Sequence, residues 1–291
     1  MAQDLVPRLI ELIRLTSTSL PAGIETYLAQ AEQEEKTGSP AQFTLQTILE
    51  NVHTAREKST PICQDTGTPT FYVRKPVTED AAEIRSKILA AVKQATQKYY
   101  LRPNAVDSIT AVNSGDNLGG PFFPAIHFED AGDQTLRFDL ILKGGGCENV
   151  SRQYALPDTG LNAGRDLDGI RKAVLDAVYQ AQGRGCAPGF LAVVVGGDRQ
   201  AGYQAAKELF REDFLGHHTD PDIARLETQI TNEANQLNIG PMGFGGRSTI
   251  LHTRIVSLHR LPASFFVTVS YMCWAFRRRT LTIQDGKVVY S

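Results

Sequence analysis

The sequence predicts an α+β fold (mixed α/β), in which a helical N-terminal segment precedes a partly antiparallel sheet flanked by helices. Residues 1–58 have mainly helical apolar spacing, whereas the rest of the chain mixes helical stretches with short β-like runs. The last two β-like runs, 247–258 and 263–272, follow one another directly, which favours antiparallel strands over a purely parallel sheet. We expect one domain over residues 1–291.

Three helical patterns fill the first sixty residues. Apolar residues recur at three- and four-residue spacing, as Leu5, Leu9 and Ile13 show. The pair Ser39–Pro40 separates the second pattern from the third. The predicted helices span residues 2–15, about 22–36 and about 41–57.

Strands and further helices alternate after residue 60. Short runs rich in β-branched and aromatic residues predict strands, and longer periodic stretches predict helices. The predicted strands are TFYVRK (70–75), LRFDLILK (136–143), FLAVVVGG (190–197) and the two final runs. The predicted helices span 79–99, 164–183 and 200–237.

Composition excludes several classes of protein. With 42% hydrophobic and 21% charged residues in 291, the chain is an ordinary globular protein. Its net charge of −2 and lack of a basic run argue against a nucleic-acid partner. The first residues lack the order of a signal peptide, and the longest apolar run is too short to span a membrane. We therefore expect a soluble cytoplasmic protein.

Three of the four cysteines occupy the same kind of place, an irregular stretch beside a β-like run. Cys63 opens CQDTG, Cys186 lies in GRGCAPG, and Cys273 directly follows the last run. Distant cysteines in a cytoplasmic chain favour thiols over a disulfide framework. Three loop thiolates could hold zinc or an iron–sulfur cluster, and buried apolar thiols are a third reading. Spacing by itself leaves these alternatives open.

The fourth cysteine, Cys147, lies in the glycine-rich stretch KGGGCEN, which directly follows a predicted strand. Successive glycines let the main chain approach a ligand and direct N–H groups at an anion. Lys143 adds positive charge, so we count it as a candidate substrate-binding residue. A flexible turn is the alternative reading.

Charged residues near these loops suit an anionic substrate. Asp65 is two residues from Cys63, and Arg102 follows a predicted helix, where its guanidinium could bind a carboxylate through two hydrogen bonds. A solvated surface arginine is the alternative for Arg102. At least two of the three arginines 277–279 are expected at an exposed edge or partner surface.

The histidines give a weaker indication. His217 and His218 are expected to be exposed in a loop. His252 and His259 flank a β-like run and are candidates for facing a site.

In four motifs, CQDTG, KGGGCEN, GCAPG and SYMCWAFRR, the sequence resembles the class I, iron–sulfur fumarate hydratase and L-tartrate dehydratase family, as an alpha subunit or N-terminal domain. The motifs occur in the expected order and spacing, and the match runs from about residue 40 to residue 280. The resemblance implies a hydro-lyase with a 4Fe–4S cluster that adds or removes water across a fumarate-like double bond.

The resemblance also implies roles for individual residues. It implies that Cys63, Cys186 and Cys273 hold the cluster and leave one iron open as a Lewis acid. Cys147 stands where many relatives carry serine, which places it beside the substrate. His259 lies two residues from the position of a histidine in relatives. The implied substrate contacts are Gln64, Arg102, Gly145 and Gly146, and Asp65 is assigned to proton transfer.

The expected function is the interconversion of (S)-malate and fumarate plus water. L-tartrate dehydration is one alternative, and a non-catalytic scaffold that binds zinc or a cluster is another. Family members carry a second module, as a fused C-terminal domain or a beta subunit, for which this chain has no room. We therefore expect such a partner, assembly into an oligomer and little activity of the chain alone.

Overall fold

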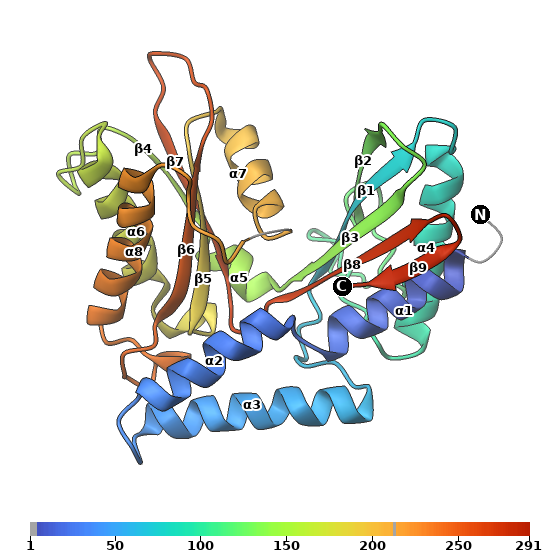
Figure 1. Cartoon of the computed structure of the whole chain (residues 1–291), viewed down its shortest axis with the longest axis horizontal. Coiled ribbons are helices and arrows are strands. Elements are labelled where there is room, and N and C mark those ends of the chain that lie inside the picture. Colours follow the sequence, from blue (N-terminus) through green and yellow to red (C-terminus); the bar gives the residue numbers. More distant parts are fainter. Residues whose placement is uncertain (1–4, 212–213) are drawn as a thin grey trace. The chain divides into compact units, whose positions relative to one another are not determined.

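The computed structural model describes residues 5–211 and 214–291 and divides into two compact units (Figure 1). Unit 1 comprises Met1–Pro21, Glu50–Gly145 and Ala275–Ser291, and unit 2 comprises Ala22–Leu49 and Gly146–Trp274. Each unit has its own sheet and its own hydrophobic core. The expectation of one catalytic domain over the whole chain stays a prediction.

Unit 1 contains a five-stranded sheet with the order β2-β1-β3-β8-β9. Strands β1 and β2 are parallel, and the other neighbouring pairs are antiparallel. The strands are β1 (Thr68–Pro76), β2 (Ala125–Ala131), β3 (Leu136–Lys143), β8 (Arg277–Gln284) and β9 (Lys287–Tyr290).

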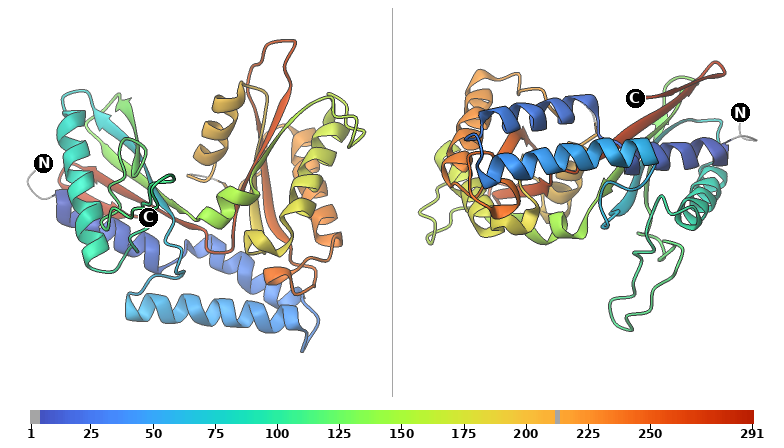
Figure 2. Two further views of the ribbon diagram at one scale, coloured as in Figure 1. Left: turned by 180° about the vertical axis from the view of Figure 1, so that it is seen from behind. Right: turned by 90° about the horizontal axis from the view of Figure 1, so that it is seen from below.

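Helices α1 (Leu5–Thr18) and α4 (Ala81–Gln97) lie side by side against this sheet (Figures 1 and 2). The apolar stripe of α1 is completely buried at Leu9 and Ile13, which explains its helical period. Asp80 caps α4 by accepting the N–H of Ala82. The irregular segment between α4 and β2 projects from unit 1 (Figure 2, right).

Unit 2 contains a four-stranded sheet with the order β4-β7-β5-β6. Strands β5 and β6 are parallel, and β7 runs antiparallel to both of its neighbours. Residues 190–194 of β5 are buried throughout, which explains their unbroken apolar run. The strands are β4 (Arg152–Ala155), β5 (Gly189–Val195), β6 (Ile250–Ser257) and β7 (Phe266–Met272).

Helices cover both faces of the unit 2 sheet. Helices α6 (Leu167–Ala181) and α8 (Pro221–Gln236) lie on one face, and α7 (Arg199–Glu208) lies on the other (Figure 1). The remaining elements are α2 (Ala22–Glu34), α3 (Pro40–Lys58), α5 (Gly145–Val150), and the short 3₁₀ helices η2 (Gln182–Gly185) and η3 (Pro241–Gly243).

The α+β class is confirmed, and the predicted helices and strands form with small shifts of their ends. Residues 2–4 of the first predicted helix lie outside the described residues. The helix predicted over 200–237 was wrong as a single element, because Asp220 and Pro221 cap and start a separate helix there. The glycine stretch predicted as a loop forms α5, and strands β2, β4, β8 and β9 were not predicted.

Among the helices of the described ranges, none combines the length and the apolar character that crossing a membrane requires.

Candidate functional site

The segment Cys63–Gly67 belongs to unit 1 and connects α3 to β1. The Ile62 N–H donates to the carbonyl of Ser17 at 2.9 Å and fixes the start of the segment. At its end, a Cβ added to Gly67 would lie 2.8 Å from main-chain atoms of Leu142 and Lys143. The segment is therefore pressed against the end of β3, and Cys63 is half-buried in it.

Asp65 is held at three points. Its Oδ1 accepts the N–H of Gly67 at 2.9 Å, and its Oδ2 accepts the N–H of Gly145 at 2.8 Å. Its main-chain carbonyl accepts a hydrogen bond of 2.7 Å from the buried guanidinium of Arg277. A Cβ on Gly144 would lie 2.8 Å from Oδ2, so only glycine permits this approach. The candidate proton-transfer group thus has a fixed position in unit 1.

The main chain of Arg102 is tied to the same segment. Its N–H donates to Oγ1 of Thr66 at 3.1 Å, and the side-chain amide of Asn104 donates to the same hydroxyl at 3.0 Å. Thr66 is fully buried, whereas Gln64 and Arg102 are exposed. Two side chains suited to a carboxylate are therefore open to solvent on adjoining backbone segments.

The glycine stretch differs from its prediction. Lys143 ends β3 and is buried, with 3% of its surface exposed, and the next residues turn into the short helix α5. The Gly145 N–H, expected to point at an anionic ligand, donates to Asp65 instead. Gly145 is exposed, and Gly146, the first residue of this stretch in unit 2, is half-buried.

The other three cysteines lie together in unit 2. Cys273 directly follows β7, and its N–H donates to Sγ of Cys147 at 3.3 Å. The N–H of the next residue, Trp274, donates to the carbonyl of Cys186 at 3.4 Å. Cys147 and Cys273 are buried, and Cys186 is half-buried. The end of one strand therefore joins the segments that carry the two other cysteines.

Cys186 has a left-handed backbone conformation, with φ of 54°. A non-glycine residue in such a region costs about 1–3 kcal/mol and persists only where its surroundings hold it. The Cys186 N–H donates to the carbonyl of Gly183 at 3.1 Å, and the Met242 N–H donates to the carbonyl of Ala187 at 2.8 Å. Hydrogen bonds on both sides thus hold the strained residue.

Tyr271, near the end of β7, is a buried phenol. Burial raises its pKa well above the usual value, and Cys273, Cys147 and Cys186 raise the pKa further.

The donors suit a soft metal centre in their chemistry, since thiolates are the preferred ligands of iron–sulfur clusters and of structural zinc. Within residues 5–211 and 214–291, no group of three His, Cys, Asp or Glu side chains is placed so that it could hold a metal ion. Cys186 and Cys273 belong to unit 2 and Cys63 to unit 1.

The arginine run does not lie at an exposed edge, and its alternative placement at a partner surface stays a prediction. Arg277 is 1% exposed, and Arg278 and Arg279 are half-buried, because β8 pairs with β3 along this run. Arg279 also donates to Oγ of Ser19 at 3.1 Å. Three consecutive arginines did not indicate from the sequence that this run lies within a sheet.

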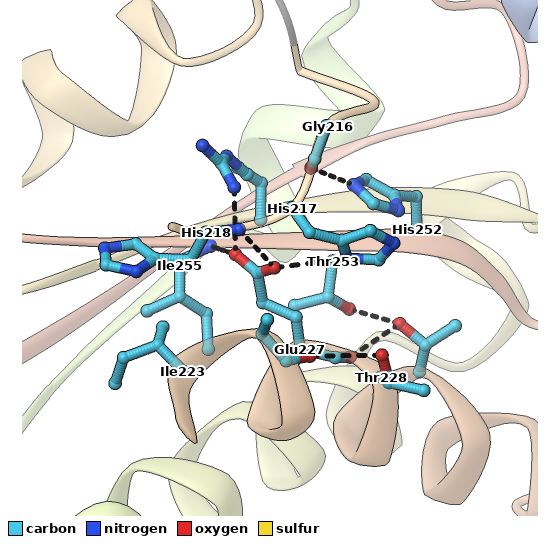
Figure 3. A network of polar contacts seen from close by, with 12 residues as sticks. Gly216, His217, His218, Ile223, Glu227, Thr228, His252, Thr253 and Ile255 are labelled. Atoms are coloured by element: carbon cyan, nitrogen blue, oxygen red, sulfur yellow. Dashed lines mark hydrogen bonds and ion pairs between the residues drawn. The ribbon is translucent and has the colours of Figure 1, made fainter. Parts of the chain in front are cut away.

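The histidines surround a buried carboxylate that the sequence did not indicate (Figure 3). Glu227 of α8 is 1% exposed and accepts the main-chain N–H groups of His218 at 3.0 Å and Ile255 at 2.8 Å. His217 Nδ1 lies 3.4 Å from the same carboxylate. Glu227 therefore fastens the loop before α8 to strand β6.

His252 anchors the same loop from the other side. Its Nε2 lies 3.1 Å from the carbonyl of Gly216 (Figure 3). Its ring packs against Phe214 and Tyr27. Burial lowers the pKa of His252. His217 and His259 are exposed, and His218 is half-buried. The expected exposure is therefore seen for His217 and only in part for His218.

The family follows from comparison with known proteins. A family model described as fumarate hydratase (fumerase) matches residues 7–282. The chain belongs to the fumarate hydratase family. The family proposed from the four motifs is confirmed.

Three relatives within this family show which members it resembles. The chain is 49% identical over 95% of its length to the "Putative fumarate hydratase class I" of Geobacillus stearothermophilus, and it covers 54% of that protein. It is 32% identical over 96% of its length to the "Putative L(+)-tartrate dehydratase subunit alpha" of Methanocaldococcus jannaschii, covering 98% of that protein. The "L(+)-tartrate dehydratase subunit alpha" of Escherichia coli UTI89 is 31% identical over 97% of the chain, with 92% of that protein covered. The chain thus spans about half of the fumarate hydratase relative and nearly all of the two alpha subunits.

Proposed function

We propose that this chain is the iron–sulfur part of a hydro-lyase that interconverts (S)-malate and fumarate plus water. One structural observation supports this beyond family membership. The N–H groups of Cys273 and Trp274 bind the Cys147 sulfur and the Cys186 carbonyl, so that three soft donors gather at one strand end. Two of these cysteines, Cys186 and Cys273, are thiols that the proposal assigns to the cluster, and thiolates are the usual ligands of such clusters.

The cofactor in this proposal is a 4Fe–4S cluster held by Cys63, Cys186 and Cys273. When bound, such a cluster has one iron without a protein ligand, which supplies a Lewis acid for cleavage of the C–O bond of malate. Cys147 is buried and accepts a main-chain hydrogen bond, and we place it beside the substrate rather than on the iron.

The remaining residues bind the substrate and move its proton. Arg102 and Gln64 are exposed, and Lys143 brings a buried positive charge to the end of β3, so together they suit the two carboxylates of malate. We also place the main chain of Gly145 and Gly146 beside the substrate, with the Gly145 N–H donating to Asp65. Two N–H groups orient the Asp65 carboxylate, which we assign to transfer of the C3 proton.

L-tartrate is the second candidate substrate. The two tartrate dehydratase alpha subunits match this chain over nearly their whole length, whereas the more similar relative is named a fumarate hydratase. Initial rates with malate, fumarate and L-tartrate on the assembled enzyme decide between them. If L-tartrate is turned over faster than malate and fumarate, L-tartrate is the substrate and the malate proposal fails.

Iron and acid-labile sulfide on the anaerobically reconstituted chain test the cofactor. We expect about four irons per chain and absorption near 400 nm, because the cluster contains four of each atom. Cys186→Ser should lose both, and Cys147→Ser, the matched control, should keep them. Iron lost equally from both variants would overturn the ligand assignment.

Metal analysis also tests the proposal against a non-catalytic scaffold. A chain that binds no iron after reconstitution, and instead binds stoichiometric zinc, would be a structural metal protein, and the hydro-lyase proposal would fail.

A further inference from the structure

Tyr271 lies where β7 meets all three cysteine-bearing segments of unit 2. It is the second-last residue of β7, two positions before Cys273, and only 2% of its surface is exposed. It is part of the hydrophobic core of unit 2, which also contains Val269 of the same strand. The proposed chemistry gives this side chain no role.

The loop that carries Cys186 packs closely against the aromatic ring of Tyr271. A Cβ added to Gly185 would lie 2.7–3.2 Å from three ring carbons, and a Cβ on Gly189 would lie 2.2 Å from Cζ and 2.3 Å from the hydroxyl oxygen. Real Cβ atoms do not approach so closely, so both glycines are required by the ring. Neither has a positive φ, and their need for glycine is therefore steric.

The main chain around Tyr271 binds the other cysteine segments. Its own N–H donates to Oγ of Ser151 at 3.1 Å, and that hydroxyl donates to the carbonyl of Cys147 at 2.8 Å. The N–H groups of Cys273 and Trp274 reach Cys147 and Cys186, as described above. Three residues at and just after the end of β7 thus bind the segments that carry Cys147 and Cys186.

The conformation of the Cys186 loop needs such support. Cys186 itself is in the left-handed region, which a free loop would leave for an ordinary conformation. The ring of Tyr271 fills the space between Gly185 and Gly189, on the two sides of this residue. Removing the ring would remove the surface that the loop follows.

We propose that Tyr271 is a positioning residue whose aromatic ring fixes the Cys186 loop in a ligand-ready conformation before any cluster is present. The relevance to a cluster rests on the function proposed above, whereas the effect on the loop does not. A thiol held in place needs less ordering when it binds a metal, so the ring should raise the yield and rate of cluster loading.

Thiol reactivity of the cluster-free chain tests the proposal directly. Alkylation by iodoacetamide under anaerobic conditions, followed by mass spectrometry, gives a rate for each cysteine, and Cys63 in unit 1 is the internal reference. Tyr271→Leu should raise the Cys186 rate relative to Cys63 about tenfold, because local opening exposes the thiol. Tyr271→Phe keeps the ring and should stay within about twofold of the wild type.

Two further variants separate positioning from general loss of stability. Val269→Ala removes buried volume from the same strand and core, and it should lower the unfolding midpoint without changing the Cys186 rate. Gly185→Ala disturbs the same contact from the loop side and should act like Tyr271→Leu even if that variant fails to fold.

Cluster loading then links the loop to the proposed function. Reconstituted Tyr271→Leu should bind iron and sulfide several-fold more slowly than Tyr271→Phe. An unchanged Cys186 rate in both Tyr271→Leu and Gly185→Ala would overturn the positioning role. A wild-type chain that takes up no iron would instead refute the proposed function, while the alkylation result would still decide the role of Tyr271.

Discussion

Asp65 combines an observed structural role with the proton transfer that we propose for it. It accepts N–H groups from Gly67 and Gly145, so the same oxygens that orient the group also close the turn before β1 and the start of α5. A substitution of Asp65 is therefore expected to affect both stability and turnover. The two effects can be separated, because loss of the hydrogen bonds changes the unfolding free energy and loss of proton transfer changes the turnover, by different amounts.

We expect Asp65→Asn to lower the turnover of the assembled enzyme by about 100-fold or more, since a positioned acid or base contributes about 10²–10⁴. The amide keeps the shape of the side chain but turns an NH₂ group toward a donor, which should cost about 1–3 kcal/mol of unfolding free energy. Steady-state kinetics and denaturant unfolding measure the two effects.

Asp107→Asn is the control for this prediction. Oδ1 of Asp107 accepts the N–H groups of Ile109 and Thr110 in an exposed turn of the same unit. This variant should change turnover by less than about twofold. Near-normal turnover of Asp65→Asn would show that the carboxylate does not take part in proton transfer.

The cysteine positions were predictable to the level of the segment. Strand periodicity shows where β5 and β7 begin and end, and Cys186 and Cys273 fall directly beside them. The contact of Cys273 with Cys147 was not predictable, because it depends on α5, whose glycines have low helix propensity. Arg277 was missed for a similar reason, since its burial depends on the carbonyl of Asp65, a partner from a distant segment.

At the scale of elements, two glycines with nearly equal backbone angles allow a matched experiment. Gly67 has φ of 78° and Gly115 has φ of 80°. A Cβ on Gly67 would meet the main chain of β3 at 2.8 Å, whereas a Cβ on Gly115 would have open space. The difference between the two alanine variants therefore isolates the contact with β3 from the cost of the conformation.

We expect Gly115→Ala to cost about 1 kcal/mol of unfolding free energy, which is the typical cost of a left-handed alanine. Gly67→Ala should cost about 3 kcal/mol or more, because the main chain of β3 must also move. Denaturant unfolding of both variants gives the two values. Equal losses would mean that the CQDTG segment is not pressed against β3 in solution.

His252 makes the stability of unit 2 depend on pH. Its pKa is lowered from 6.5, mainly by burial, so the unfolded chain binds the proton more tightly than the folded unit. As the pH falls below about 6.5, unfolding takes up a proton and stability is lost, by at most about 1.4 kcal/mol per pH unit, until the folded pKa is reached. Unfolding midpoints at pH 5–7.5 measure this slope.

The slope should shrink in His252→Asn and persist in His259→Asn, whose histidine is exposed. An identical slope in His252→Asn would assign the pH dependence to groups other than His252.

Elements were predictable where one local pattern determines them. The 3.6-residue period of α1, α4 and α6 and the apolar run of β5 are properties of consecutive residues. The order of the strands within each sheet is not a property of consecutive residues. In unit 2, β5 separates β6 from β7, although β6 and β7 follow one another in sequence. Strand β8 begins with three arginines, and this run is a strand because it pairs with β3 rather than because of a local sequence pattern.

At the scale of the whole molecule, the lengths of the relatives bear on the expected partner. The chain covers about half of the fumarate hydratase relative and nearly all of two proteins named as alpha subunits. We propose that a beta subunit or C-terminal module supplies further substrate-binding groups, and that the active form is an oligomer.

The cluster-loaded chain should therefore dehydrate malate slowly, and addition of the partner should raise the rate by about 100-fold or more, because it completes the set of positioned groups. Iron content measured before and after mixing controls for loss of the cluster. Full malate dehydration by the isolated, iron-loaded chain would show that no partner is needed.

The contact between the Cys273 N–H and the Cys147 sulfur also bears on how the chain folds. Strands β3 and β8 pair in unit 1, although about 130 intervening residues separate them, and closing so long a loop is entropically costly and slow. Most of those residues form unit 2, whose entry near Cys147 and exit near Cys273 touch. Once unit 2 has folded, the two ends of the segment between β3 and β8 are already close together. Strand β8 can then pair with β3 as if only a short connection separated the two strands. The contact between Cys273 and Cys147 thus also brings together the two chain ends from which the sheet of unit 1 is completed.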